Sequence, residues 1–202
     1  MNLTASPWIV AVILGLVALS PARAGITPEE VKEFEANKIK AEKGDAVAQF
    51  NLGGFYADGN GVTKDYAEAH KWWRKAAEQG EPLSSVALAV CYTHGRGVTK
   101  DYAEAAKWWR KAAEMGDVGS QGILGSLYIL GLGVKKDDIE AYAYLNLAKE
   151  TNESARKNLL LVEKRLSSDD RILGQQRTKQ IKKEIEGRLA AVEALRKSTE
   201  KK

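Results

Sequence analysis

The sequence predicts an all-α protein built from repeated helix pairs. The first observation is internal repetition: a 20-residue motif that begins at Gly59 recurs 36 residues later, at Gly95, with eighteen of twenty positions identical. A third copy begins at Gly131 and matches the second at nine of twenty positions. The second observation is that apolar residues in each copy recur every third or fourth position, which is the spacing of one helix face. A repeat of this length indicates an array in which each unit packs mainly against its neighbours.

The first segment, 1–24, is predicted to be a secretory signal peptide. An apolar run occupies 8–19 and is followed by Ala22-Arg23-Ala24. The run is shorter than the roughly 20 residues that span a bilayer, and the small-x-small sequence suits signal peptidase. We expect cleavage after Ala24 and a periplasmic or secreted protein. The alternative is an uncleaved anchor, because no Lys or Arg precedes the run.

Segment 25–43 is predicted to be an N-terminal capping helix. Thr27 suits the N-cap, Pro28 the first helical position, and Glu30 the position three residues after the cap. The segment lacks the tryptophans of the repeats and is rich in charged residues. These features are expected of a terminal helix with one face in water.

Three units follow, at 44–79, 80–115 and 116–151, and the first half of each is predicted to be a helix. In the first unit Leu52 and Tyr56 are spaced by four, and both recur at the same place in the other two units. This spacing puts them on one helix face.

A turn and a second helix complete each unit. Gly59 and Gly61 suit a helix end, because glycine readily adopts the left-handed conformation. Asp65 then precedes Glu68 by three, the spacing of an N-cap and its capping carboxylate. The second helix combines small residues with large aromatic ones at Ala69, Trp72, Trp73 and Ala76, at Ala105, Trp108, Trp109 and Ala112, and at Ala141, Tyr144, Leu145 and Ala148.

These residues resemble the Sel-1-like repeat, a relative of the tetratricopeptide repeat. The pattern is L-G-x-x-Y-x-x-G-x-G-V followed by D-x-x-x-A-x-x-W-x-x-K-A-A-E, and it covers about 44–150. The resemblance implies antiparallel helix pairs stacked into a right-handed α-solenoid that binds proteins on its concave side. Ala89 replaces the glycine found at 53 and 125, and Tyr144 replaces tryptophan, so we expect less regular packing in the third unit.

The last segment, 152–202, is predicted to hold C-terminal capping helices and a basic tail. A helix is expected over 154–166, and Ser167 and Asp170 suggest the start of another that extends to about 197. The later helix carries an apolar stripe of Ile181, Ile185, Leu189 and Val192. Three roles stay open for it: packing back on the array, pairing with a partner helix or lying on a membrane surface, the last being the least favoured.

No catalytic constellation, metal site or cofactor site is predicted. Cys91 is the only cysteine and aligns with Phe55 and Leu127, so we interpret it as a small buried hydrophobic residue. Two histidines and one cysteine are too few for a typical zinc site. The S-x-x-K sequences at 154–157 and 198–201 resemble the nucleophile motif of serine beta-lactamases, but the companion motifs S-D-N and K-T-G are absent.

A binding surface is predicted on the first helix of each unit, on the concave side that the resemblance implies. Its candidate residues differ between units, as recognition residues would, and are Phe50, Asp58, Val86, Val90, His94 and Ile129. Such an apolar groove suits a peptide or helix. The alternative is that some of these side chains simply contact the next helix. We expect a protein or peptide partner and no nucleic acid, and the oligomeric state stays open.

Three functions remain under consideration. The favoured one is a non-catalytic interaction scaffold or adaptor of the bacterial cell envelope. The second is a hydrolase of cell-wall fragments or beta-lactams, by analogy with cysteine-rich members of the family. Those members carry a regular pair of cysteines in each repeat, which this chain lacks. The third is a structural module that oligomerises through its C-terminal helix.

One prediction tests the register of the repeats. Trp108→Ala removes a large ring from an expected contact between helices and should lower the free energy of unfolding by about 3–5 kcal/mol. Thermal melting followed by circular dichroism measures the loss. An unchanged Tm would contradict the assigned register.

Overall fold

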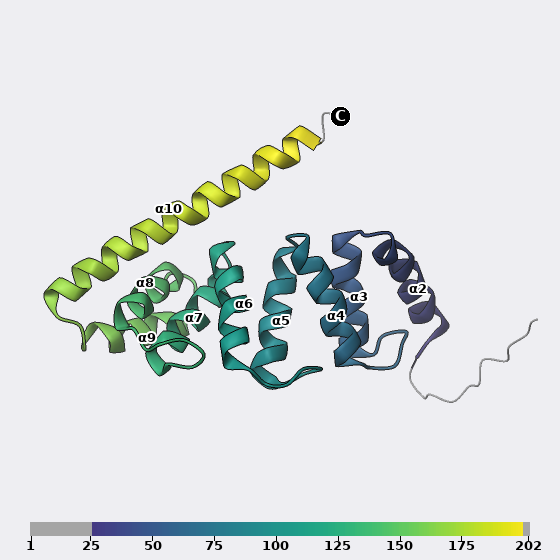
Figure 1. Cartoon of the computed structure of the whole chain (residues 1–202), viewed down its shortest axis with the longest axis horizontal. Helices are drawn as coiled ribbons and strands as arrows, with labels where there is room; N and C mark the ends of the chain where they lie inside the picture. Colours follow the sequence, from purple (N-terminus) through teal and green to yellow (C-terminus); the bar gives the residue numbers. More distant parts are fainter. Residues whose placement is uncertain (1–25, 200–202) are drawn as a thin grey trace, which may run out of the picture.

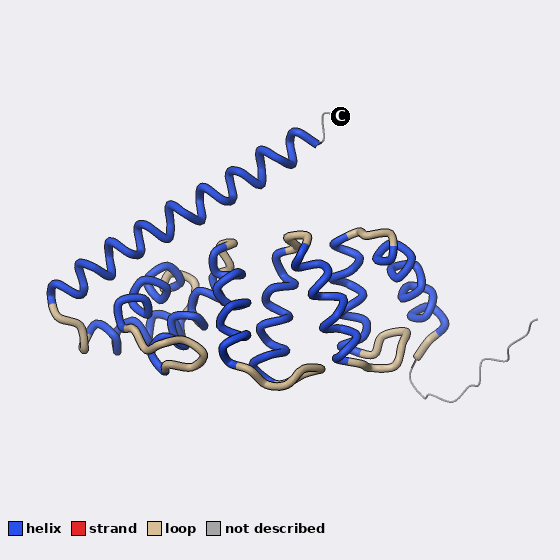
Figure 2. Tube along the Cα trace, viewed as in Figure 1, coloured by secondary structure: helices blue, strands red, loops and turns tan. Residues whose placement is uncertain are grey.

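The computed structural model describes residues 26–199, and every regular element in that range is a helix (Figure 2). The predicted signal segment lies outside the described residues. The helices are α2 (Pro28–Glu42), α3 (Ala46–Asp58), α4 (Tyr66–Glu78), α5 (Pro82–His94), α6 (Tyr102–Glu114), α7 (Val118–Leu130), α8 (Asp138–Ala148), α9 (Glu153–Glu163) and α10 (Ser168–Thr199). The prediction of an all-α array is confirmed.

Each predicted unit forms one helix pair, and the pairs stand side by side along the array (Figure 1). We call the first helix of each pair helix A (α3, α5 and α7) and the second helix B (α4, α6 and α8). Every helix A packs against its own helix B and against the helix B of the preceding unit. An isolated pair would therefore leave an apolar face in water, so the stacking of units stabilises the array.

Aspartates begin the B helices as predicted, but the expected reciprocal bond from the glutamate does not form. The Asp65 carboxylate accepts hydrogen bonds from the backbone N–H groups of Ala67 and Glu68. The backbone N–H of Asp65 donates instead to the carbonyl oxygen of Tyr56, at 2.8 Å. Because that amide is already satisfied, the Glu68 carboxylate forms an ion pair with Lys71 on the helix surface.

The second glycine of each turn brings neighbouring units into contact. Gly97 has a φ of 71°, and a Cβ atom there would clash with the backbone carbonyl of Tyr66 in the preceding helix B. Gly133 lies in the same way against Tyr102. The turn therefore needs glycine both for its left-handed backbone and for the space that a side chain would fill.

Helix α2 occupies the position of a helix B that precedes the first unit. Gly61 lies against the backbone of Glu30, which is 36 residues before Tyr66. The Phe34 ring meets Tyr56 edge to face at 5.5 Å, as the His70 ring meets Tyr92 at 5.3 Å one unit later. Thr27 and Glu30 form the capping box that the sequence predicted. The capping helix is thus half of a further repeat unit.

Indole rings fill the interior of the first two units in two different ways. Trp73 packs against Gly53, where a Cβ atom would lie 2.5 Å from the ring, and its Nε1 donates to the carbonyl of Phe50. In the second unit Ala89 replaces that glycine, and the Nε1 of Trp109 donates to the hydroxyl of Thr93. The methyl group of Ala89 is therefore accompanied by a different hydrogen-bond acceptor for the indole: a threonine hydroxyl in place of a backbone carbonyl.

Trp108, the residue chosen to test the register, is partly buried. It packs against the apolar clusters on both sides of the second unit. Its neighbour Trp109 is more deeply buried. The predicted destabilisation of Trp108→Ala thus involves contacts with two units.

Helices α9 and α10 do not form an antiparallel pair of the kind that each helix A forms with its helix B. It packs across α8, reaches α6 and runs back along the array (Figure 1). Ile181 is 2% exposed and Ile185 is also buried, whereas Val192 is 64% exposed. Of the three roles left open for this stripe, packing on the array is correct for its first half. The second half, from Leu189 onward, remains exposed.

A pair of glycine substitutions tests the contact between units. Gly95 and Gly97 share a φ of 71°, but a Cβ atom on Gly95 would only approach Lys100, at 3.4 Å. Gly95→Ala should cost about 1–2 kcal/mol from the left-handed backbone alone. Gly97→Ala should cost more than about 4 kcal/mol, because the Tyr66 backbone must also move. Urea denaturation measures both values, and equal losses would contradict the close approach.

A second pair tests the docking of α10. Ile181→Ala should lower the free energy of unfolding by about 2–5 kcal/mol, because it leaves a cavity at a buried site. Val192→Ala on the exposed half should change it by less than about 0.5 kcal/mol. Denaturation curves of the two variants give the comparison. Equal effects would show that α10 is not held against the array in solution.

Candidate functional site

Four of the six residues predicted to bind a partner contact the neighbouring unit. Phe50 is partly buried against the cluster between the first and second units. Val86 and Val90 pack in the same way toward the third unit, and Ile129 packs toward α8 and α9. The sequence left open that these side chains contact the next helix, and such contacts are indeed part of their role.

The other two predicted residues lie at the exposed ends of A helices. Asp58 and His94 are the last residues of α3 and α5 and occupy equivalent positions one unit apart. Both are exposed. The exposed side of α3 and α5 also carries Val47, 62% exposed, and Leu83, 54% exposed, at equivalent positions. We call this exposed side the A-helix face.

One cavity brings two of the predicted residues together at the N-terminal end. It encloses about 520 Å³ between α2 and α3, and its lining includes Phe50 and Asp58. Glu30 and Glu33 of α2 also line it, which makes this end of the A-helix face acidic. Analysis of the repeats alone missed these carboxylates, because α2 was interpreted as a cap and not as part of a unit.

The A-helix face ends at the third unit, where α9 covers part of α7. The side-chain amide of Asn158 donates to the Ser126 hydroxyl at 3.0 Å. A Cβ atom on Gly122 would lie 2.8 Å from the side chain of Asn152. A partner can therefore reach the equivalent residues of α7 less easily than those of α3 and α5.

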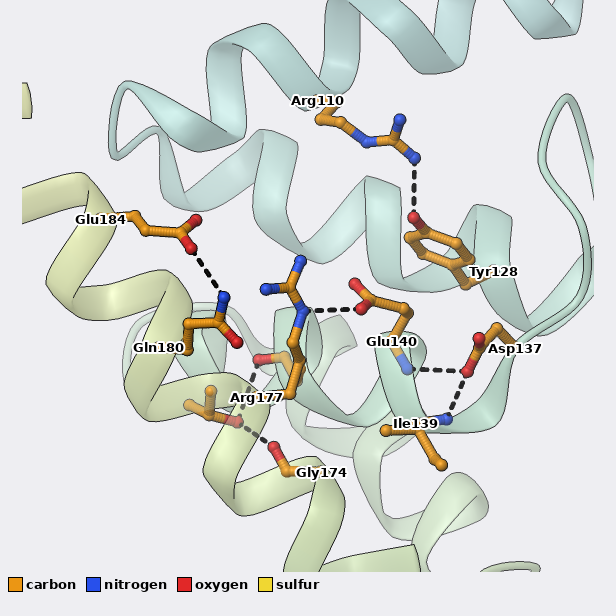
Figure 3. Close-up of polar contacts among 11 residues, drawn as sticks. Arg110, Tyr128, Asp137, Ile139, Glu140, Gly174, Arg177, Gln180 and Glu184 are labelled. Carbon is orange, nitrogen blue, oxygen red and sulfur yellow. Dashed lines mark hydrogen bonds and ion pairs between the residues drawn. The ribbon is translucent and has the colours of Figure 1, made fainter.

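A second cavity, of about 590 Å³, lies where α6, α8 and α10 meet (Figure 3). The sequence analysis did not predict it, because α10 completes it by folding back over α8. Its lining is made of charged and aromatic side chains together with one valine: Arg110, Glu114, Tyr128, Val134, Lys135, Asp137, Glu140, Tyr144 and Arg177. We call it the α6–α8–α10 cavity.

Hydrogen bonds and an ion pair in the walls of this cavity are drawn in Figure 3, and two tyrosine rings also stack there. The Arg177 Nε donates to a Glu140 carboxylate oxygen at 2.6 Å, which joins α10 to α8. The Arg110 guanidinium donates to the Tyr128 hydroxyl at 2.7 Å. The rings of Tyr128 and Tyr144 stack with centroids 6.0 Å apart and planes 13° apart.

Two groups of the cavity wall, Tyr144 and Arg177, have raised pKa values. Burial raises the pKa of Tyr144 to about 12, and the Glu140 charge acts in the same direction. Burial opposes the positive charge of Arg177, but its hydrogen bond and attraction to Glu140 outweigh burial and raise the arginine pKa. At neutral pH the cavity therefore presents a neutral phenol and a permanent cation.

The groups considered for chemistry have structural surroundings. Cys91 is buried, as predicted, and burial raises the pKa of its thiol to about 11. Lys157, the lysine of the first S-x-x-K sequence, forms an ion pair with Glu153. Ser198 donates its hydroxyl proton to the backbone carbonyl of Leu195. Among the described residues, Ser154 forms no hydrogen bond with Lys157, and Lys201 of the second sequence lies outside them.

Within residues 26–199, no three His, Cys, Asp or Glu side chains gather closely enough to hold a metal ion. No helix in the same range has the length and apolar character needed to cross a membrane.

Comparison with known proteins agrees with the helix-pair architecture. The family model of the Sel1 repeat matches residues 46–81, 82–117 and 120–150. This chain belongs to the Sel1 repeat family. Proteins of this family are generally protein-interaction scaffolds, and their fold is typically non-catalytic.

Two solved structures resemble this chain over much of its length. The protective antigen c5321 of uropathogenic Escherichia coli displays an SLR (Sel-1-like repeat) fold. It is 32% identical to this chain in sequence, with a TM-score of 0.69. That match covers 82% of this chain and 36% of the antigen. A Sel1 repeat protein from Oxalobacter formigenes is 38% identical with a TM-score of 0.61, over 64% of this chain and 54% of that one. No curated protein matches the sequence.

Proposed function

We propose that this protein is an interaction scaffold or adaptor of the bacterial cell envelope, and that it binds a peptide or helix of a partner protein on the A-helix face. The general role of Sel1 repeats supports a protein partner. The apolar run at 8–19, followed by Ala22-Arg23-Ala24, supports export to the periplasm or beyond the cell.

The observation that carries this proposal is the exposure of Val47 and Leu83 on consecutive A helices. Val47 and Leu83 stand at equivalent positions one unit apart, so both are exposed on the A-helix face, where apolar groups of a partner can be buried against them. Phe50 and Val86 lie one helical turn further along the same helices and are partly buried. A helix or extended peptide that lies across the two units would cover all four side chains.

A double substitution tests the A-helix face without disturbing the core. Val47→Glu with Leu83→Glu places two carboxylates on exposed positions, so stability should change by less than about 1 kcal/mol in total. We expect the wild type to be crosslinked to an envelope partner in its native cells and the double variant to lose that product. Crosslinking followed by affinity purification and mass spectrometry measures this.

The matched control is Leu160→Glu with Leu161→Glu on α9, where both leucines are equally exposed at 55%. This control should retain the crosslinked partner. Loss of the partner in both double variants would contradict a role for the A-helix face. The absence of any partner with the wild type would contradict the scaffold function itself.

A further inference from the structure

We propose that the α6–α8–α10 cavity binds the carboxylate of an acidic segment in a partner protein, with Arg110 as its principal contact. This second contact rests on the proposed scaffold function but uses residues distinct from the A-helix face.

The docking of α10 separates an arginine from its usual partner. In the first unit, Arg74 forms an ion pair along α4 with Glu78, at 3.4 Å. Arg110 and Glu114 are their equivalents 36 residues later. There Arg188 of α10 binds the Glu114 carboxylate at 2.7 Å, and Arg110 donates to the Tyr128 hydroxyl instead. Among residues 26–199, the Arg110 guanidinium therefore has no carboxylate partner, whereas its equivalent Arg74 has one.

Tyr128, which accepts the hydrogen bond from that guanidinium, has ring neighbours unlike those of the equivalent tyrosines. Phe34 and His70 place rings edge to face against Tyr56 and Tyr92. The next equivalent residue is Ala106, which has no ring to place against Tyr128. The face of Tyr128 stacks instead on Tyr144, which stands where the first two units have tryptophan. The ring contacts beside Arg110 therefore differ from those of the two earlier equivalent tyrosines.

The carboxylates in the wall are already engaged. Glu140 accepts the Nε donor of Arg177, and Glu114 binds Arg188. The Asp137 carboxylate accepts two backbone N–H groups at the start of α8. All three carboxylates are therefore bonded to other groups, and their negative charges still act on any anion that enters the cavity.

The cationic groups retain donor capacity. A guanidinium has five N–H donors. Arg177 is bonded to Glu140 only through Nε, and Arg110 to Tyr128 only through one terminal nitrogen. The Lys135 side chain at the rim has no carboxylate partner in the part of the chain that the structure describes. These donors lie around one cavity and favour an anionic group.

A carboxylate fits this environment better than a phosphate or a nucleic acid. Its single charge is spread over two oxygens in a plane, which matches the fork of a guanidinium. A dianionic phosphate would be repelled more strongly by Glu114, Asp137 and Glu140, which lie in the same wall. The two tyrosines and Val134 supply apolar surface for the stem of the side chain and for its neighbour in the peptide.

A peptide titration tests the proposal. The probe is an N-acetylated, C-terminally amidated five-residue peptide that alternates leucine and glutamate, and the matched probe has glutamine in place of glutamate. Isothermal titration calorimetry with the purified protein at low salt gives the dissociation constants. We expect the glutamine peptide to bind at least about tenfold more weakly, because it cannot form charge-assisted hydrogen bonds with the arginines.

The variants distinguish the cavity from general surface charge. Arg110→Gln should weaken binding of the glutamate peptide about tenfold, and Arg110→Lys should weaken it less, since the charge is kept and the fork is lost. Arg74→Gln is the matched control at the equivalent position and should change binding less than about twofold. Thermal melting of each variant verifies that it is folded.

Three results would overturn the proposal: no binding of the glutamate peptide by the wild type, equal binding of both peptides, or equal losses in Arg110→Gln and Arg74→Gln. A glutamine peptide with a free C-terminal carboxylate shows whether a chain end is accepted in place of a side chain. The double variant Val47→Glu, Leu83→Glu should retain peptide binding. If this variant loses the envelope partner but still binds the peptide, the two proposed contacts are independent, and each can be tested without the other.

Discussion

The close approach between each turn and the preceding B helix is the constraint on which the rest of the array depends. Gly97 and Gly133 lie against the backbones of Tyr66 and Tyr102, where a side chain would clash. This contact sets how near successive units stand and thus allows each A helix to be buried between two B helices. Fully buried leucines at equivalent positions, Leu52, Leu88 and Leu124, show the same interior geometry in all three units.

The two ends of the array meet this constraint differently. At the N-terminal end, α2 supplies a helix B against which Gly61 can pack, so the first unit has the same neighbour as the others. At the C-terminal end, α9 covers α7 and α8 as a further helix A would, but α10 folds back across α8. Gly174 permits this crossing, because a Cβ atom there would lie 2.6 Å from the ring of Tyr142.

Regularity and divergence have separate consequences in this molecule. The nearly identical B helices α4 and α6 carry equivalent arginines. Helix α10 reaches α6, where its Arg188 binds Glu114 and Arg110 lines the α6–α8–α10 cavity. Divergence in the third unit provides Tyr144, which stacks on Tyr128. In the second unit, Ala106 lacks the ring that Phe34 and His70 place at the equivalent position. A uniform framework therefore supports a local site without a change in the framework itself.

The helical class, the 36-residue period and most helix starts can be predicted from the sequence, because they depend on local features such as N-cap aspartates and turn glycines. The alignment of Cys91 with Phe55 and Leu127 likewise predicts that this residue is buried. The fold was needed to show the path of α10, the role of α2 as half a unit and the partial burial of Phe50, Val86, Val90 and Ile129. These depend on contacts between residues far apart in the chain, and an apolar stripe such as Ile181 and Ile185 does not specify which surface will cover it.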